Sequence, residues 1–347
     1  MAAYISFQPS DFFKTLLYTG DGTASRAITG VGFEPGMLWT KIRDMGYGHN
    51  LNDAVRGNSQ WLTPDNITAN QNYPTYVYSL DSDGFTLGNG VSSDGQVNQD
   101  TKTFVSYSWK TGTTTGLSGG TITPSAYSIN TTSGIGIYQY TGTGSAATIA
   151  HGLGATPELI ICKKTSGTNG WFVQHGSLGP TKYVMLDLTQ ESITNSTPWN
   201  DTAPTSTLFT LGTGSGVNVS AGTFMAYVFA PKKGYSKFGT YDGNGNVDGT
   251  FVYTGFRPAW IVLKISNTTG DWYLFDDKRV GYNVDNNALL ANSTVAETTT
   301  DYIDILSNGF KLRSTLGVIN GSANPIIYMA FADFPFVSSN SKPGTAR

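Results

Sequence analysis

The chain has 347 residues, and only 13% of them are charged, about half of the roughly 25% that is usual in soluble domains. With a net charge of −3 and no cluster of Lys and Arg, it lacks the basic footprint of a nucleic-acid-binding protein. No apolar run reaches the roughly 18 residues of a membrane span, no secretion signal is expected at the start, and the single cysteine excludes a disulfide within the chain.

The first predicted module covers residues 1–110 and begins with a strand that runs into the glycine turn Tyr18–Gly22. A second turn, Gly32–Pro35, precedes an apolar segment, and proline suits the first residue of a strand because no ladder hydrogen bond is lost there. The module closes with the alternating strand Phe104–Trp109. Residues 111–133 are rich in Gly, Ser and Thr, so we predict a flexible or extended linker.

The same pattern returns twice farther along the chain. In each copy, a tyrosine before a glycine turn is followed 17 residues later by a proline, and a lysine stands six residues beyond that proline. Fourteen residues beyond the proline stands a tryptophan in the second and third copies and a histidine in the first. The equivalent residues are Tyr18, Tyr140 and Tyr241, then Pro35, Pro157 and Pro258, then Lys41, Lys163 and Lys264, and finally His49, Trp171 and Trp272. These spacings predict an all-β chain of three tandem β-sandwich (jelly-roll-like) modules with about seven strands each.

The second module is predicted at residues 134–231 and the third at 235–336. The link between them is so short that we expect the two to be packed together or stiffly coupled. In the third module, the apolar and β-branched run Trp260–Ile265 predicts a strand that is buried on both faces. Only short segments such as Ala288–Ala291 suit a helix, and residues 337–347 form a polar tail.

A search for reactive groups finds no catalytic set. The histidines His49, His151 and His175 have no metal-ligand spacing, and we expect them to be surface or hydrogen-bonded residues. Cys162 lies in an apolar run, which favours a small buried side chain over a reactive thiol. No acid recurs at one position in all three copies, so the repetition favours a scaffold over a catalytic cleft. We therefore predict neither enzyme activity nor a cofactor.

The best candidate for a metal site is a loop at the start of the third module. Oxygen-bearing side chains alternate there as in a calcium loop, at Asp242, Asn244, Asn246 and Asp248. Val247 nevertheless occupies the position at which a calcium loop has glycine, and the equivalent turns of the other copies lack the acids. A turn built by Asn, Asp and Gly explains the segment as well, and we favour it over a calcium site.

Three aromatic residues outside the repeat pattern are candidates for ligand binding. Trp61 and Trp199 stand in polar, proline-containing segments, and Tyr282 follows a glycine in a long segment of the third module. Aromatic rings displayed beside Asn and Asp can stack on sugar rings. The alternative, which we favour, is that these large rings fill the ends of the sandwiches.

One set of residues resembles a known family. The block Lys237–Trp260, together with Leu306–Arg313 and Ile327–Ala332, is similar to a repeated module of virion proteins from marine tailed phages, which infect cyanobacteria and other marine bacteria. The resemblance is close over the third copy, good over the second and loose over the first. It implies a tail-fibre-like or other structural protein of the virion, without catalytic residues to transfer.

The resemblance and the repeats together lead to three functional hypotheses. The first is a tail-fibre or receptor-binding component for host attachment, homotrimeric, with the divergent first module docking on the particle. The second is a capsid decoration, cement or head-spike protein, and the third is a glycan depolymerase. The expected location is the virion surface, after assembly in the host cytoplasm. The expected partners are other virion proteins and a host surface glycan or protein, without nucleic acid or membrane insertion.

Overall fold

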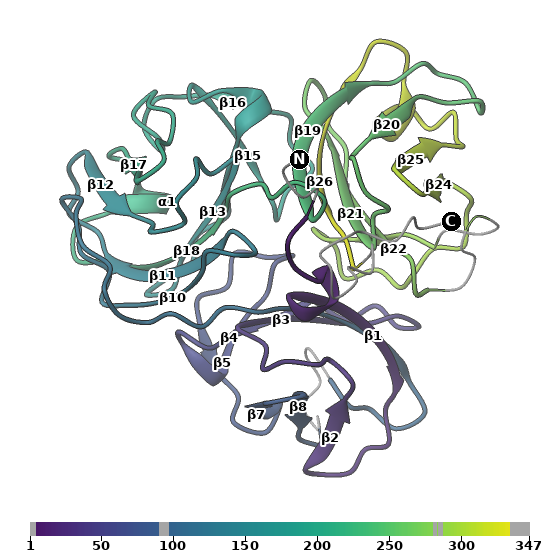
Figure 1. Ribbon diagram of the computed structural model, residues 1–347, viewed down its shortest axis with the longest axis horizontal. Helices are drawn as coiled ribbons and strands as arrows, with labels where there is room; N and C mark the ends of the chain where they lie inside the picture. The colour runs from purple at the N-terminus through teal and green to yellow at the C-terminus, as the bar shows by residue number, and fades with distance from the viewer. Residues whose placement is uncertain (1–4, 90–96, 280–282, 284–286, 334–347) are drawn as a thin grey trace.

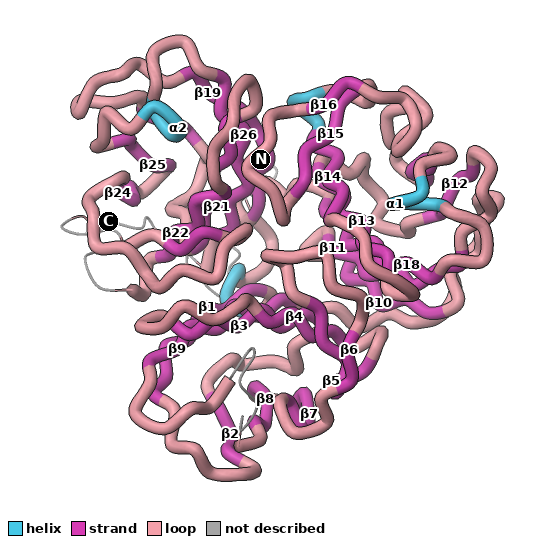
Figure 2. Tube along the Cα trace, turned by 180° about the vertical axis from the view of Figure 1, so that it is seen from behind, coloured by secondary structure: helices cyan, strands magenta, loops and turns pink. Residues whose placement is uncertain are grey.

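The computed structural model describes residues 5–89, 97–279, 283 and 287–333, and these residues form an almost purely antiparallel β structure. The all-β prediction is confirmed. Viewed down its shortest axis, the molecule shows three lobes around a common centre, one for each predicted module (Figure 1). Figure 2 shows the helices only as short cyan turns between the strands. The predicted tail 337–347 and Tyr282 lie outside the described residues.

Each predicted module contributes one large sheet and one small sheet. In the first module the large sheet has the order β1-β9-β3-β4-β5-β6 and the small sheet the order β2-β8-β7. A short 3-10 helix, η1 (Pro9–Asp11), precedes the first strand. The strands are β1 (Phe13–Thr19), β2 (Arg26–Thr29), β3 (Met37–Ile42), β4 (Asn50–Asp53), β5 (Gly57–Leu62), β6 (Gln71–Asn72), β7 (Val77–Asp81), β8 (Gly84–Leu87) and β9 (Thr103–Trp109).

The second module begins earlier than the sequence suggested. Its elements are β10 (Ala126–Asn130), β11 (Ile135–Thr141), β12 (Ala147–Ala150), β13 (Leu159–Lys164), β14 (Trp171–His175), η2 (Gly176–Leu178), β15 (Lys182–Met185), β16 (Ile193–Thr194), β17 (Leu208–Leu211), α1 (Ser215–Asn218) and β18 (Thr223–Phe229). The large sheet has the order β10-β11-β18-β13-β14-β15-β16, and β12 pairs with β17. The prediction of a linker over all of 111–133 was therefore wrong at its end, because Ala126–Asn130 forms a hairpin with β11.

The third module has the simplest sheets, with the orders β19-β26-β21-β22-β23 and β20-β25-β24. Its elements are β19 (Ser236–Asp242), β20 (Phe251–Tyr253), β21 (Trp260–Ile265), β22 (Trp272–Asp276), β23 (Leu289–Leu290), β24 (Ile303–Leu306), β25 (Gly309–Leu312), α2 (Gly317–Asn320) and β26 (Pro325–Phe331). The expectation of a helix at Ala288–Ala291 was wrong, because Leu289 and Leu290 pair with β22 instead.

The central strands of the large sheets are buried on both faces, as predicted for Trp260–Ile265. Along β21, Trp260 and Val262 point into a core shared by all three modules, while Ile261 and Leu263 point into the third module's own core. Side chains alternate between the two faces of a strand, so one apolar run serves both cores. This explains why the run lacks the apolar–polar alternation of a half-exposed strand.

The shared core, here called the three-way core, joins the modules into one body. It contains Trp39, Trp109, Tyr227, Trp260 and Phe331, together with further side chains from every module. Trp260 lies against Trp109, with ring centroids 5.4 Å apart, and against Phe331 at 5.7 Å. The first module therefore packs as closely as the other two, and the modules are not strung out along a line.

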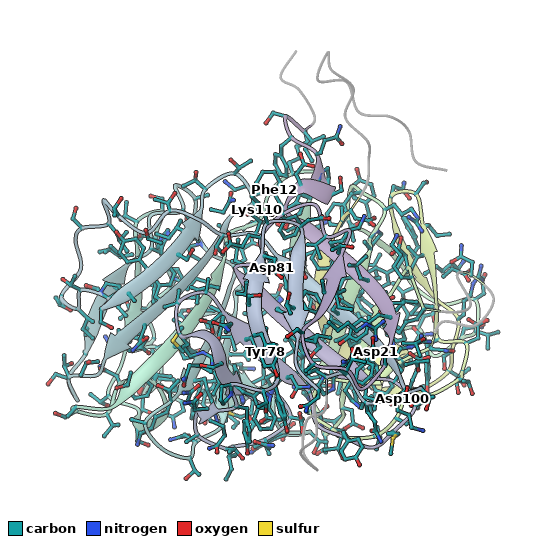
Figure 3. All side chains as sticks on the ribbon, turned by 90° about the horizontal axis from the view of Figure 1, so that it is seen from below. Phe12, Asp21, Tyr78, Asp81, Asp100 and Lys110 are labelled. Atoms are coloured by element: carbon teal, nitrogen blue, oxygen red, sulfur yellow. The ribbon has the colours of Figure 1, made fainter. Side chains whose placement is uncertain are left out.

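The two ends of the assembly differ. Phe12 and Lys110 lie at one end of the first module, whereas Asp21 and Asp100 lie at the other (Figure 3). β1 and β9 run between these ends, and Lys110 stands over the ring of Phe12. We call the end with Phe12 the entry end and the opposite one the junction end.

Candidate functional site

Polar groups at equivalent positions bind the modules to one another in a cycle. Trp171 donates from Nε1 to Thr63 O of the first module at 3.0 Å, and Trp272 donates to Met185 O of the second at 2.8 Å. His49 closes the cycle, because its Nε2 lies 2.9 Å from Leu290 O of the third module. The histidine in the first copy thus makes the same kind of bond as the tryptophans. This order gives the chain approximate threefold symmetry.

The tautomer of His49 follows from its second contact. Trp39 donates from Nε1 to His49 Nδ1 at 2.9 Å, so the ring proton must reside on Nε2, which then donates to Leu290 O. Burial is the main cause that lowers the pKa of His49 well below its ordinary value. His151 and His175 are also buried and hydrogen-bonded. All three histidines therefore serve the fold as neutral rings.

The three equivalent lysines are buried and bind backbone carbonyls. Lys41 Nζ donates to Ile42 O at 2.8 Å and to Thr294 O of the third module at 3.3 Å. Lys264 Nζ donates to Ile265 O and to Thr189 O of the second module, at 2.9 and 3.1 Å. Burial lowers the pKa of Lys41, Lys163 and Lys264 to about 8 in each case.

These lysines give a testable pH dependence. Between pH 8 and about 10, the folded lysines have lost protons that the unfolded chain still binds, so the free energy of unfolding is expected to rise with pH. Lys264→Met removes one of three equal contributions, and we expect the rise to shrink by about a third. Urea unfolding at several pH values measures it. An unchanged slope in the variant would contradict the assignment.

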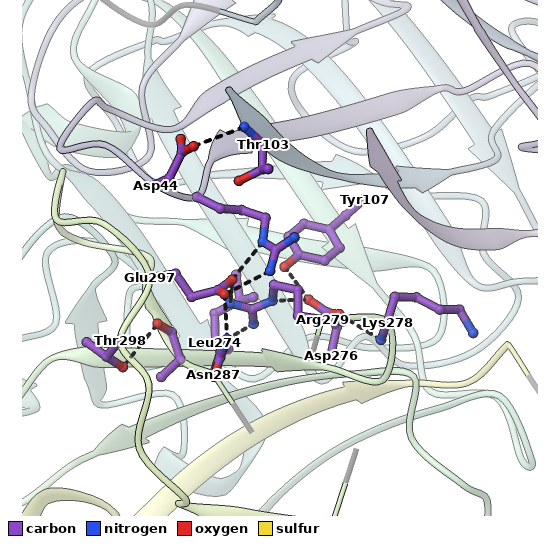
Figure 4. A network of polar contacts seen from close by, with 12 residues as sticks. Asp44, Thr103, Tyr107, Leu274, Asp276, Lys278, Arg279, Asn287, Glu297 and Thr298 are labelled. Carbon is purple, nitrogen blue, oxygen red and sulfur yellow. Dashed lines mark hydrogen bonds and ion pairs between the residues drawn. The ribbon is translucent and has the colours of Figure 1, made fainter. Parts of the chain in front are cut away.

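A buried ionic network joins the first and third modules (Figure 4). Tyr107 donates to Asp276 Oδ2 at 2.7 Å, and Arg279 contacts the same oxygen at 2.5 Å. Arg279 also pairs with Glu297 at 3.1 Å, and Glu297 accepts two bonds of 2.9 Å from Arg43. Burial acts to raise the pKa of Asp276, but Arg279 and Tyr107 outweigh it and hold the carboxyl below its ordinary value.

The same Tyr–Asp–Arg arrangement recurs between the first and second modules, but other residues replace it between the second and third. Tyr227 of the second module donates to Asp53 Oδ2 at 2.8 Å, and Arg56 pairs with that carboxylate at 2.7 Å. The equivalent positions at the junction of the second and third modules hold Met329, His175 and Leu178. There His175 Nε2 donates to Tyr328 O at 3.1 Å. The carboxylates of Asp53 and Asp276 are therefore engaged in contacts between modules.

The loop proposed for calcium is a series of Asn turns. Asn246 N donates to Asn244 Oδ1, Asp248 N donates to Asn246 Oδ1, and Asn320 Nδ2 also donates to Asn244 Oδ1. Asp248 pairs with Lys311 at 2.5 Å. Among the described residues, no three His, Cys, Asp or Glu side chains gather as a metal site. The oxygens of Asn244 and Asn246 are therefore engaged in the turn that we favoured.

The candidate aromatic residues lie mostly inside the protein. Trp199 is fully buried in the core of the second module, and Trp61 is 6% exposed in the core of the first. Cys162 is buried as predicted, and burial raises the pKa of its thiol to about 12. Tyr282 lies outside the described residues. Trp199 therefore fills a sandwich, whereas Trp61 also reaches a pocket.

That pocket, here called the junction pocket, lies in the first module beside Thr294 of the third and has a volume of about 260 Å³. Its walls carry rings and polar side chains, namely Tyr47, Trp61, Asp65, Gln71, Tyr73 and Thr294, among others. The sequence pointed only to Trp61. Tyr47, Asp65 and Tyr73 have no signal of their own, because they lie in separate loops next to β4, β5 and β6 that meet only when these strands pair.

Among the described residues that line the junction pocket, Asp65 is the only acid. Its Oδ1 accepts a bond of 2.7 Å from His49 N, which fixes the carboxylate in place. Burial is the main cause that raises the pKa of Asp65 to about 6. Asp187 accepts from Trp171 N in the same way in the second module, and Asn292 accepts from Trp272 N in the third.

Comparison with known proteins gives one match. The model of a family described as "Domain of unknown function (DUF7483)" matches residues 8–335. This match runs through all three modules, so the unit of that family is the whole three-lobed assembly. A search of curated proteins and a search of solved structures yield no match. In the described part of the chain, no helix is long and apolar enough to cross a membrane.

Proposed function

The chain belongs to the DUF7483 family, and we propose that it is a non-enzymatic structural protein of a phage virion that serves in host attachment. The observation that carries the proposal is that the buried acids, lysines and histidines, which are the side chains that catalysis most often uses, are engaged in contacts within the fold. Those that bind a neighbouring module join the three modules into one body, and they are Lys41, His49, Asp53, His175, Lys264, Asp276 and Glu297. A body of this kind can hold surface loops in fixed positions for binding to a partner. The resemblance to virion modules of marine tailed phages supports the same role.

The junction end is the face that we assign to display. At this end, each contact between two modules has one exposed apolar side chain beside it. These are Ile67, which is 53% exposed, Leu188, at 41%, and Val295, at 43%. The loops that carry them bind the neighbouring module, through Asn169 N to Ile67 O at 3.0 Å and Gly270 N to Thr189 O at 2.7 Å. We take these exposed side chains at equivalent loops as part of the proposed contact surface.

The three modules lie side by side, and each of them extends to both ends of the molecule. We therefore assign docking and display to the two ends and not to separate modules. We propose other virion proteins as partners at the entry end and a host surface glycan or protein at the junction end. The homotrimer stays a proposal that light scattering tests against the chain mass of 37.1 kDa.

Two experiments on particles test the proposed function. Antibodies raised against the purified chain are expected to label the tail of intact virions in gold-labelled micrographs and to block adsorption to host cells. Labelling of the capsid lattice would instead favour the alternative, a decoration or cement protein. Shortening of host polysaccharide by the purified chain would favour the third candidate, a depolymerase. Absence of the chain from virions would overturn all structural roles.

A further inference from the structure

We propose that the junction pocket binds one neutral hexopyranose unit of a host surface glycan. This inference rests on the proposed role in host attachment. The pocket lies at the junction end, since its wall includes Thr294, next to the exposed Val295, and Asn66, next to the exposed Ile67. A glycan held there would touch both the first and the third module.

The rings of the pocket form a rigid wall. Trp61 meets Tyr73 edge to face, with ring centroids 4.9 Å apart, and Tyr73 stacks on Tyr76 at 4.8 Å. Tyr47 and Tyr73 are half-buried and keep part of their surface in the pocket. A pyranose presents a face of C–H groups that packs on such rings, and rings held by their neighbours lose little entropy on binding.

The polar groups of the pocket suit hydroxyls. Trp61 and Gln71 are paired residues on β5 and β6, so an aromatic ring and an amide stand side by side. The Gln71 amide nitrogen donates to two nearby backbone oxygens, Ala69 O and Asn70 O, at 3.2 and 3.4 Å. The Asp65 carboxylate is held by His49 N. An amide and a fixed carboxylate beside aromatic rings can accept and donate bonds to neighbouring sugar hydroxyls.

The charge of the pocket selects the class of sugar. Among the described residues of its wall there is an acid, Asp65, and no Lys or Arg. The charge of Lys41 acts to lower the pKa of Asp65, but the Lys41 ammonium donates its hydrogen bonds to backbone oxygens. A uronic or sialic acid would bring its carboxylate toward Asp65 without a cation to pair it, which costs binding energy. Neutral hexoses and N-acetylhexosamines fit instead.

The experiment is a titration of the full chain with methyl glycosides of glucose, galactose, mannose, N-acetylglucosamine and glucuronic acid, followed by protein NMR or calorimetry. At least one neutral glycoside is expected to bind at least tenfold more tightly than the glucuronide. Asp65→Asn and Tyr73→Ala are each expected to weaken that binding at least tenfold. Tyr253→Ala is the matched control, because Tyr253 is 56% exposed in the hollow between the second and third modules.

Asp65→Asn retains an oxygen that can accept the bond from His49 N, so we expect this variant to fold. It therefore still tests the pocket if Tyr73→Ala fails to fold. Binding of no neutral glycoside, or binding that survives both variants, would overturn the pocket assignment. If antibodies label the tail and block adsorption while no glycoside binds, the pocket proposal fails and the attachment role stands. If a glycoside binds at the pocket but the chain is absent from virions, the attachment role fails instead.

Discussion

Replacing Arg279 with leucine is expected to lower the free energy of unfolding by about 3–5 kcal/mol, because Asp276 would remain buried without its counter-charge. Asp276 would keep the bond from Tyr107, but a neutral hydroxyl does not compensate a buried carboxylate. Glu297 would lose one of its two arginine partners as well. Denaturant unfolding of both proteins at pH 7 measures the difference.

The chain supplies its own matched control for this prediction. The junction of the second and third modules uses Met329, His175 and Leu178 at the positions equivalent to Tyr107, Asp276 and Arg279. A triple variant, Tyr107→Met with Asp276→His and Arg279→Leu, removes the whole buried ion pair. It is expected to be more stable than Arg279→Leu alone. Equal stability of the two variants would show that the uncompensated charge is not the cause of the loss.

Truncating Trp260 to alanine is expected to cost about 3–5 kcal/mol and to weaken all three modules together. Trp260 is 2% exposed at the centre of the three-way core, where it contacts rings of the first and third modules. A cavity there removes packing on which every large sheet depends. Unfolding is expected to remain a single transition, and amide hydrogen exchange is expected to quicken in strands of each module.

Trp199→Ala is the comparison for this second prediction. Trp199 is equally buried but lies in the core of the second module alone. Its truncation is expected to quicken exchange most in the strands around that core, such as β12 and β17. If Trp260→Ala quickened exchange only in the third module, the modules would be independent domains and the three-way core would not unite them.

The sequence predicts the strand pattern well because the signals for turns and strands within each repeat lie close together along the chain. Tight turns require glycine or proline at fixed places, and a strand buried on both faces requires an unbroken apolar run, as at Trp260–Ile265. The same reasoning failed at Ala126–Asn130, where pairing with β11 outweighs a polar composition. It also failed at Ala288–Ala291, where pairing with β22 outweighs helix propensity.

The candidate site was much less accessible to prediction. The polar surroundings of Trp61 single it out in the sequence, yet they give no sign that Tyr47, Asp65 and Thr294 meet it. Thr294 is separated from Trp61 by most of the chain, and a contact of that kind depends on how the modules pack. Tyr282, the third aromatic candidate, stays a prediction.

By itself, the sequence determined the all-β class, the positions of the central strands and the equivalence of Lys41, Lys163 and Lys264. Those properties follow from local patterns of turn residues and apolar runs. Only the tertiary structure decided that the three modules share a core and that His49 takes the place of a tryptophan at a junction. It also decided that Tyr107 meets Asp276. These contacts join residues from different modules, and no pattern along the chain specifies which sheet faces meet.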